Sequence, residues 1–156
     1  MEQIYTHPKR KTKVVFVQLG SPSEPTTKAL RKYLRKFLGD PRVIDINPWL
    51  WKIILNFFVL PFRPKKSAKL YARIWDGKSF PLITHTRDFT NNVREELKKI
   101  DPNGHVEVNH AFLLSPPYVN EVYDSWEDDL KKGIGATKLL VIPMFPQYSE
   151  STIASG

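Results

Sequence analysis

The sequence predicts an α/β protein, a doubly wound parallel sheet with helices on both faces. Three short apolar runs, residues 14–17, 111–114 and 139–142, are typical of strands that are covered on both sides. Segments with helical periodicity separate these runs, and such alternation favours parallel pairing with right-handed crossovers. A proline-rich stretch at about 40–81 interrupts the alternation, so we expect a helical insertion after the first strand and helix.

The first strand is expected over Lys13 to Leu19, followed by the turn Gly20-Ser-Pro22. A helix should come next, because apolar residues recur three and four positions apart. These residues are Leu30, Tyr33, Leu34, Phe37 and Leu38. Thr26 or Thr27 is suited to start this helix and Gly39 to end it.

The insertion is expected to form one or two helices, first at about 49–60 and then at about 66–75. A long insertion at the ligand-binding edge of a sheet usually serves as a lid or a binding wall. We therefore expect these helices to lie over that edge.

The remaining elements complete the sheet. A helix is predicted over Thr86 to Ile100, a strand over His105 to Leu114, and a further helix between Ser115-Pro-Pro117 and Gly133. The third strand, Lys138 to Ile142, leads into a hydroxyl-rich stretch. Ligands of open α/β sheets bind at the carboxyl edge of the strands, so this is where we expect a site.

Composition narrows the function classes. A hydrophobic content of 41% excludes a disordered tail. The chain has no cysteine, which excludes disulfides, thiolate nucleophiles and cysteine metal sites, and which suits the reducing cytoplasm. The net charge of +8 is compatible with an anionic small molecule, a membrane surface or nucleic acid. No nucleic-acid-binding motif is present, so we expect no nucleic-acid partner.

An apolar segment, residues 49–62, directly precedes a basic cluster at 63–69. The segment is too short to span a bilayer and contains Lys52 and Asn56. Two interpretations remain open. It lies against a membrane surface, which would make the protein peripheral, or it is a core helix of the fold.

Four collinear motifs resemble the ferrochelatase family, which inserts ferrous iron into porphyrins in haem biosynthesis. They are Val14-Val-Phe-Val-Gln-Leu-Gly-Ser-Pro22, Phe37-Leu-Gly-Asp-Pro-Arg-Val43, Pro61-Phe-Arg-Pro-Lys-Lys-Ser-Ala-Lys-Leu-Tyr-Ala-Arg-Ile-Trp75 and Pro146-Gln-Tyr-Ser-Glu-Ser-Thr152. The resemblance implies a chelatase-like domain over residues 13–156, preceded by a basic arm at 1–12.

The resemblance also implies a division of the enzyme into two similar halves. The histidine and glutamate that accept pyrrole protons and handle iron belong to the second half, so no catalytic residue or resident metal ligand is expected in this chain. This N-terminal half is expected to be inactive alone, with Fe²⁺ and porphyrin as substrates and no required cofactor. A C-terminal half, or pairing of two copies as in the shortest cobalt chelatases, would complete it.

Residues that match porphyrin-contacting positions of the family are the candidate site. They are Leu19, Arg63, Tyr71, Ser79 and Tyr148. A porphyrin is an apolar disc with two propionates, so its site needs an apolar wall and cations or hydroxyls at the rim.

Two stretches depart from the family pattern. The usual Met-Arg-Tyr at one strand end is Phe112-Leu113-Leu114 here, and the usual Gly-Ser-Pro is Ser79-Phe80-Pro81. Leucine cannot replace the charge of an arginine. These departures keep a second hypothesis open, a non-catalytic porphyrin or haem carrier derived from a ferrochelatase.

Overall fold

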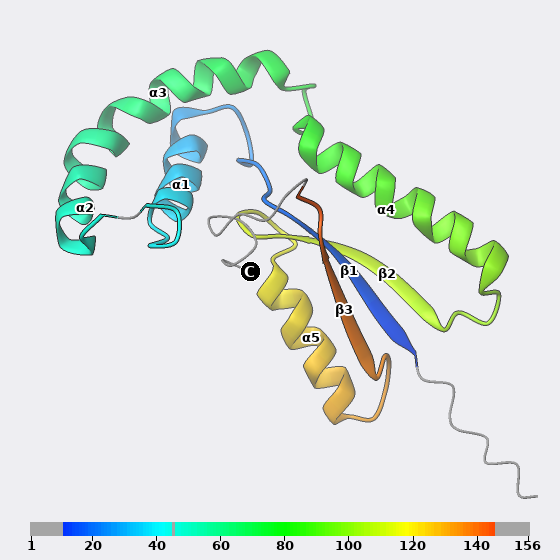
Figure 1. Ribbon diagram of the computed structural model, residues 1–156. Coiled ribbons are helices and arrows are strands. Elements are labelled where there is room, and N and C mark those ends of the chain that lie inside the picture. Colours follow the sequence, from blue (N-terminus) through cyan, green and yellow to red (C-terminus); the bar gives the residue numbers. More distant parts are fainter. Residues whose placement is uncertain (1–10, 45, 146–156) are drawn as a thin grey trace, which may run out of the picture.

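The sheet has three parallel strands in the order β2-β1-β3. The computed structural model describes residues 11–44 and 46–145, and the strands are β1 (Thr12–Gln18), β2 (Val106–Phe112) and β3 (Lys138–Pro143). Phe16 at the middle of β1 pairs with His110 on β2 and Ile142 on β3. The predicted fold class is confirmed, since an open parallel sheet is flanked by helices (Figure 1).

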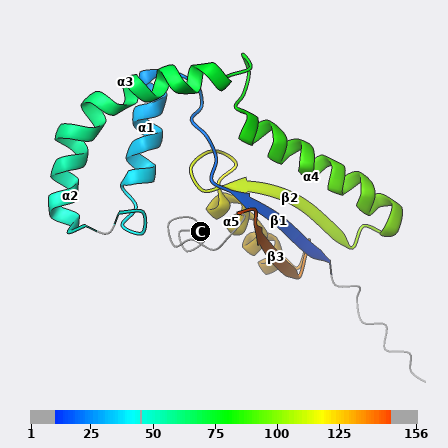
Figure 2. The same cartoon turned by 45° about the horizontal axis from the view of Figure 1, so that its top comes forward.

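The helices α4 (Pro81–Ile100) and α5 (Val119–Lys131) cover opposite faces of the sheet, as Figure 2 shows. Alternating residues of β1 explain this arrangement, because side chains along a strand point to the two faces in turn. Val14 and Phe16 pack in a cluster with residues of α4. Val15 and Val17 pack in a cluster with residues of α5.

Helix α1 (Thr27–Leu38) has the predicted ends. The side chain of Thr26 accepts a hydrogen bond from the backbone N–H of Ala29, and the N–H of Gly39 donates to the carbonyl of Arg35. Its apolar face is buried, and Leu30 is completely inaccessible to solvent.

The insertion, for which one or two helices are expected, forms one helical arm. It comprises α2 (Pro48–Ile54), a π-helical turn η1 (Leu55–Val59), α3 (Leu60–Tyr71) and a short 3₁₀ turn η2 (Ala72–Ile74). The arm stays helical at Pro61, in the first turn of α3, and at Pro64, inside α3. The arm packs on α1 through a cluster that contains Leu34, Leu55 and Leu60.

Helix α4 begins at Pro81, earlier than the predicted Thr86. Proline is favoured in the first turn of a helix, where the N–H groups need no partner within the helix. The residue before it, Phe80, has extended backbone and a side chain that is 1% exposed. The buried side chain of Phe80 therefore fixes the segment that joins the arm to α4.

No helix among the described residues combines the length and the apolar character needed to cross a membrane.

Candidate functional site

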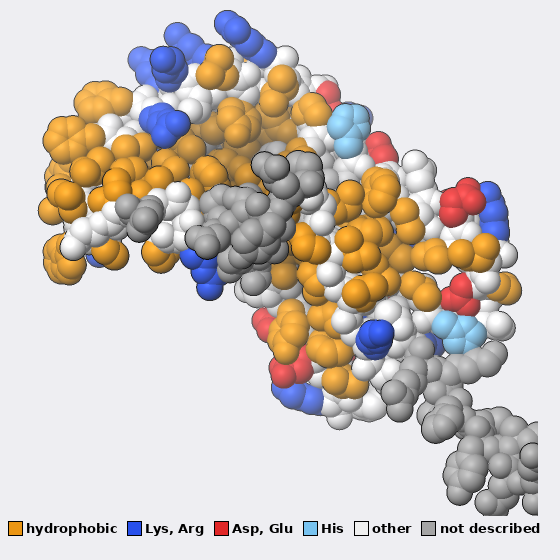
Figure 3. Space-filling view, viewed as in Figure 1, with side chains coloured by type: hydrophobic (Ala, Val, Ile, Leu, Met, Phe, Trp, Pro, Cys, Tyr) orange, Lys and Arg blue, Asp and Glu red, His pale blue; other side chains and the backbone are white. Residues whose placement is uncertain are grey.

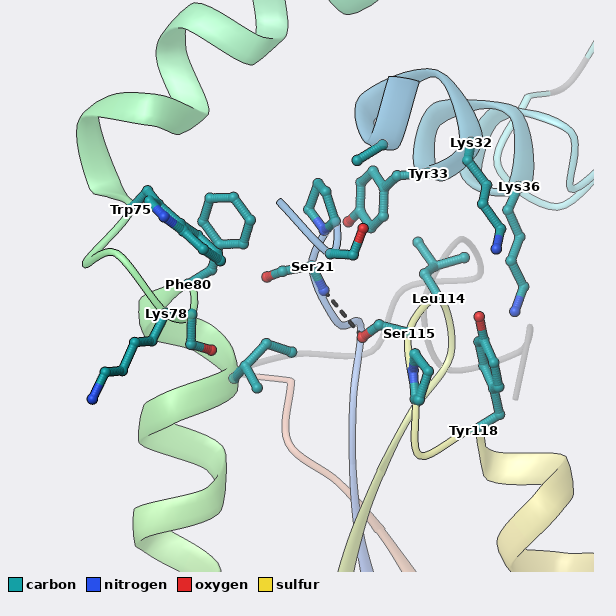
Figure 4. A pocket seen from close by; sticks show the side chains of 16 residues that line it. Ser21, Lys32, Tyr33, Lys36, Trp75, Lys78, Phe80, Leu114, Ser115 and Tyr118 are labelled. Atoms are coloured by element: carbon teal, nitrogen blue, oxygen red, sulfur yellow. Dashed lines mark hydrogen bonds between the residues drawn. The ribbon is translucent and has the colours of Figure 1, made fainter. Parts of the chain in front are cut away.

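A cavity of about 380 Å³ opens at the carboxyl ends of β1 and β2 (Figure 4). Its walls come from α1, from the segment that joins the arm to α4, and from the loop between β2 and α5. The residues that line it are Ser21, Pro22, Ser23, Ala29, Lys32, Tyr33, Lys36, Trp75, Lys78, Ser79, Phe80, Ile83, Leu114, Ser115, Pro116 and Tyr118. This is the edge at which the sequence predicts a ligand site, and the volume is in the range of about 300–1,000 Å³ that is typical of small-molecule sites.

Aromatic side chains form one wall of this cavity. The ring of Phe80 lies 4.7 Å from the ring of Trp75 and 5.4 Å from the ring of Tyr71, both in edge-to-face geometry. Tyr71 in turn lies 6.4 Å from Tyr33 of α1. These contacts connect the end of the arm to α1 and hold an apolar surface in place.

The phenol of Tyr33 donates a hydrogen bond to the carbonyl of Gly20, at 3.3 Å. Burial, followed by the nearby Tyr71, raises the pKa of Tyr33 above its ordinary value. Its hydroxyl therefore remains protonated at neutral pH.

Hydroxyl groups lie at the base of the cavity. Ser115 accepts a hydrogen bond from the backbone N–H of Ser21, at 3.3 Å, and both residues are buried. This bond joins the end of β1 to the loop after β2. Gly20 precedes Ser21 with φ +93°, a backbone conformation that residues with a Cβ rarely adopt.

Ser79 lies in a turn that Asp76 organises. One carboxylate oxygen of Asp76 accepts backbone N–H bonds from Lys78, at 2.8 Å, and from Ser79, at 2.6 Å. These two bonds lower the pKa of the Asp76 carboxyl group. The turn fixes the backbone of Ser79 next to the cavity.

Two lysines of α1 project into the cavity. Figure 4 shows the side chains of Lys32 and Lys36 directed from α1 toward Leu114 and Tyr118. The amine of Lys36 lies 3.8 Å from the centre of the Tyr118 ring, a cation–π geometry. Burial lowers the pKa of Lys36, Glu121 opposes this shift, and Lys32 adds to it.

A smaller cavity of about 120 Å³ adjoins the first and shares Lys36 and Leu114 with it. It is lined by Leu19, Lys36, Phe37, Asp40, Val43, Leu113 and Leu114. The carbonyl of Leu19 accepts a hydrogen bond from the N–H of Leu114, at 3.0 Å, so pairing between the two chain segments continues beyond β1 and β2. The two cavities are treated together as one cleft, with Lys36 and Leu114 at their junction and the carboxylate of Asp40 in the smaller part.

The predicted site residues take different places relative to this cleft. Leu19 lines the smaller cavity and Ser79 the larger one. Tyr71 packs behind Phe80, whereas Arg63 is exposed on α3, and neither lines either cavity. Tyr148 lies outside the described residues.

Sequence reasoning missed Lys32, Lys36, Trp75 and Tyr118 as cleft residues. The two lysines are four positions apart, so they lie on the same side of α1, next to its buried stripe. This spacing of four residues is the feature of the sequence from which a pair of lysines on one side of the helix could have been predicted.

His110, one of the four histidines, lies away from the cleft. Its ring packs edge-to-face on Phe112, and burial, together with the nearby charges of Arg94 and Arg87, lowers its pKa. Its Nδ1 atom is buried and has no hydrogen-bond partner among the described residues. Within the described residues there is also no group of three His, Asp or Glu side chains placed to hold a metal ion.

Exposed apolar side chains lie along the arm, and we call these residues the arm surface. Its most exposed members are Trp49, at 78%, Phe62, at 71%, and Phe57, at 70%. Figure 3 shows apolar side chains gathered over α2 and the start of α3, with basic side chains beside them along α3. An exposed apolar surface of this kind marks an interaction site more often than chance exposure does.

A family model described as ferrochelatase matches residues 11–156. The chain is 41% identical over 142 residues to a ferrochelatase of Idiomarina loihiensis, with 91% of the chain and 37% of the relative covered. It is 42% identical to a ferrochelatase of Herminiimonas arsenicoxydans, with 99% of the chain and 40% of the relative covered. A ferrochelatase of Actinobacillus pleuropneumoniae serotype 5b is 40% identical, with 91% of the chain and 42% of the relative covered. The chain spans about two fifths of the length of these relatives.

Proposed function

Since the chain belongs to the ferrochelatase family, we propose that it is the N-terminal part of a protein that inserts Fe²⁺ into a porphyrin in haem biosynthesis. In this proposal the chain supplies one wall of the porphyrin cleft. Iron and porphyrin are the substrates, and no further cofactor is required. The protein acts in the cytoplasm or at the cytoplasmic membrane surface.

The observation that carries the proposal is the cleft at the carboxyl edge of the sheet. It combines an aromatic wall, buried hydroxyls and three lysines, Lys32, Lys36 and Lys78, without a carboxylate side chain in the lining of the larger cavity. A porphyrin has a flat apolar body and acidic side chains, so both parts of the ligand would find complementary groups. Water is excluded by the apolar wall, while the cations stabilise the acidic groups.

Individual residues have distinct roles in this proposal. Leu19 and Leu114 contact the face of the macrocycle, and Ser79 offers a hydroxyl at its edge. Arg63 and Tyr71 act from the arm, where a modest movement of α3 or a porphyrin larger than the cavity would bring them into contact. Tyr148 contributes from the segment that follows β3.

The titration of the purified chain with protoporphyrin tests the proposal. We expect saturable quenching of porphyrin fluorescence and a Soret shift, with binding several-fold weaker in Arg63→Ala and in Tyr71→Phe, because each loses one polar contact of about 1 kcal/mol or more. Tyr71→Phe keeps the ring that packs on Phe80 and removes the hydroxyl only.

Arg87→Ala is the matched control, because Arg87 is exposed on α4 and lines neither cavity. Its affinity should equal that of the wild type. Absence of saturable binding by the wild type would contradict the proposal that this part of the protein forms a porphyrin wall.

Leu113 and Leu114 favour a second candidate function, a porphyrin carrier without turnover. Both side chains line the smaller cavity, at the strand end where the family resemblance leads us to expect arginine and tyrosine. Leucine offers no charge or hydroxyl for proton or metal transfer. An iron-insertion assay on the full-length protein separates the two candidates, since an enzyme turns over and a carrier only binds.

The chelatase is completed, in our proposal, by a C-terminal part that carries the proton acceptors. Pairing of two copies is the alternative. Light scattering distinguishes them, because the second arrangement requires a stable dimer of this chain.

The arm surface contacts a membrane in the same proposal. Trp49, Phe57 and Phe62 provide apolar anchors, and the neighbouring lysines of α3 favour anionic lipid headgroups. This location would bring the cleft close to apolar porphyrins dissolved in lipid.

Sedimentation with vesicles that contain anionic phospholipid tests this contact. The triple variant Trp49→Ser/Phe57→Ser/Phe62→Ser should bind at least about tenfold more weakly, because it removes three large apolar side chains. The control Ile100→Ser/Tyr123→Ser/Ile134→Ser changes three residues that are also exposed but lie elsewhere. Equal loss in both triple variants would contradict a specific role for the arm surface.

A further inference from the structure

Lys32 and Lys36 are an unusual pair for a helix surface. They are one turn apart on α1, and like charges at this spacing repel each other. The described residues provide no carboxylate within 4.0 Å of either amine. The carboxylate of Glu121 acts on Lys36 from a greater distance, and its Oε2 atom accepts the backbone N–H of Tyr118, at 3.0 Å, in the capping box of α5.

The two lysines that repel each other both lie at the cleft. Both side chains line the larger cavity, and Lys36 also lines the smaller one. The ring of Tyr118 holds the amine of Lys36 at the junction of the two cavities. Leu114 lines both cavities beside this junction, and Asp40 lines the far part of the smaller one. Both lysines are exposed, so an anion could reach their amines from solvent while its apolar body lies against the cleft wall.

We propose that Lys32 and Lys36 form a carboxylate clamp that holds an acidic side chain of the porphyrin and selects for macrocycles with free carboxylates. A single carboxylate has two oxygens and can accept hydrogen bonds from both amines at once. Binding it would relieve the repulsion between the lysines, which gives the free acid an advantage that an ester lacks. This inference rests on the proposed function. It adds the residues that distinguish porphyrins with free carboxylates from their esters.

A comparison of protoporphyrin with its dimethyl ester tests the clamp, with both porphyrins kept monomeric in dilute non-ionic detergent. We expect the wild-type chain to bind the free acid about tenfold or more tightly than the ester, since charged hydrogen bonds are stronger than neutral ones. Lys32→Gln/Lys36→Gln should lose this preference and keep the affinity for the ester. The conservative variant Lys32→Arg/Lys36→Arg retains the charge and should retain most of the preference.

Lys28→Gln/Lys132→Gln is the matched control. It removes the same charge from two exposed lysines that line neither cavity, so its preference for the acid should equal that of the wild type. Circular dichroism of each variant establishes that the fold is retained.

The outcomes separate this inference from the function on which it rests. If the wild type binds neither porphyrin, the proposed function fails, and the clamp fails with it. If the wild type prefers the acid and Lys32→Gln/Lys36→Gln prefers it equally, only the clamp is wrong. Equal weakening of acid and ester in that variant would also overturn it, because a general disturbance of the cleft would then explain the loss.

Discussion

Phe80→Ala should lower the free energy of unfolding of the chain by about 3–5 kcal/mol, the range measured for truncation of large buried aromatic residues. The Phe80 side chain is 1% exposed and packs between Trp75 and Tyr71. Its removal would leave a void where the arm joins α4, and it would remove part of the cleft wall. Urea unfolding followed by circular dichroism measures the loss, and the porphyrin titration should show weaker binding under native conditions.

Phe58→Ala is the matched control for this substitution. Phe58 is 66% exposed on the arm, so its truncation should change the free energy of unfolding by less than about 0.5 kcal/mol. A similarly small change for Phe80→Ala would contradict the buried position of that ring and the role we assign to it.

Gly20→Ala should be destabilising by about 2–5 kcal/mol, through two separable causes. The backbone at Gly20 has φ +93°, where a Cβ is strained. The added Cβ would also overlap Ser115 Oγ and crowd Phe112 Cβ, at 3.1 Å. Because these residues join β1 to the loop after β2, the strain would act directly on the base of the cleft. Thermal and urea unfolding measure the total effect.

Gly77→Ala separates the two causes. Gly77 has the same φ of +93°, but a Cβ there would meet no atom within 4 Å, so only the backbone cost of about 1–2 kcal/mol should remain. The excess cost at Gly20 measures the clash, and the double variant Gly20→Ala/Ser115→Ala should recover part of that excess. Equal costs at Gly20 and Gly77 would show that the loop after β2 can move away freely.

The strands and α1 could be predicted from sequence because their signals are local. Apolar runs mark the three strands, and the Thr26 and Gly39 ends are encoded by the residues themselves. The expectation that residues 139–142 are covered on both faces was wrong, because β3 lies at the edge of the described sheet with Leu140 44% and Val141 48% exposed. The sequence predicts one or two helices for the insertion and does not decide between them. The structure has a single arm, which stays helical at Pro61 and at Pro64.

The site could be predicted only in part. Leu19 and Ser79 line the cleft as expected, because the ends of parallel strands and the insertion meet at one edge. Lys32 and Lys36 could not be assigned from sequence, since both are exposed and exposed lysines look the same whether or not they border a cavity. Their surroundings depend on Tyr118 and Leu114, which the fold brings from a distant part of the chain.

The position of the arm between β1 and β2 affects how quickly the domain can form. Thr12 pairs with Val106, so the first two strands of the sheet come together only after α1, the arm and α4 have been accommodated between them. Closing so long a loop costs chain entropy, and contacts between residues far apart in sequence slow folding. The arm and α1 contact each other over a much shorter separation and can form first. We therefore expect the helical part of the chain to order before the sheet, and the cleft to appear last, because it requires both.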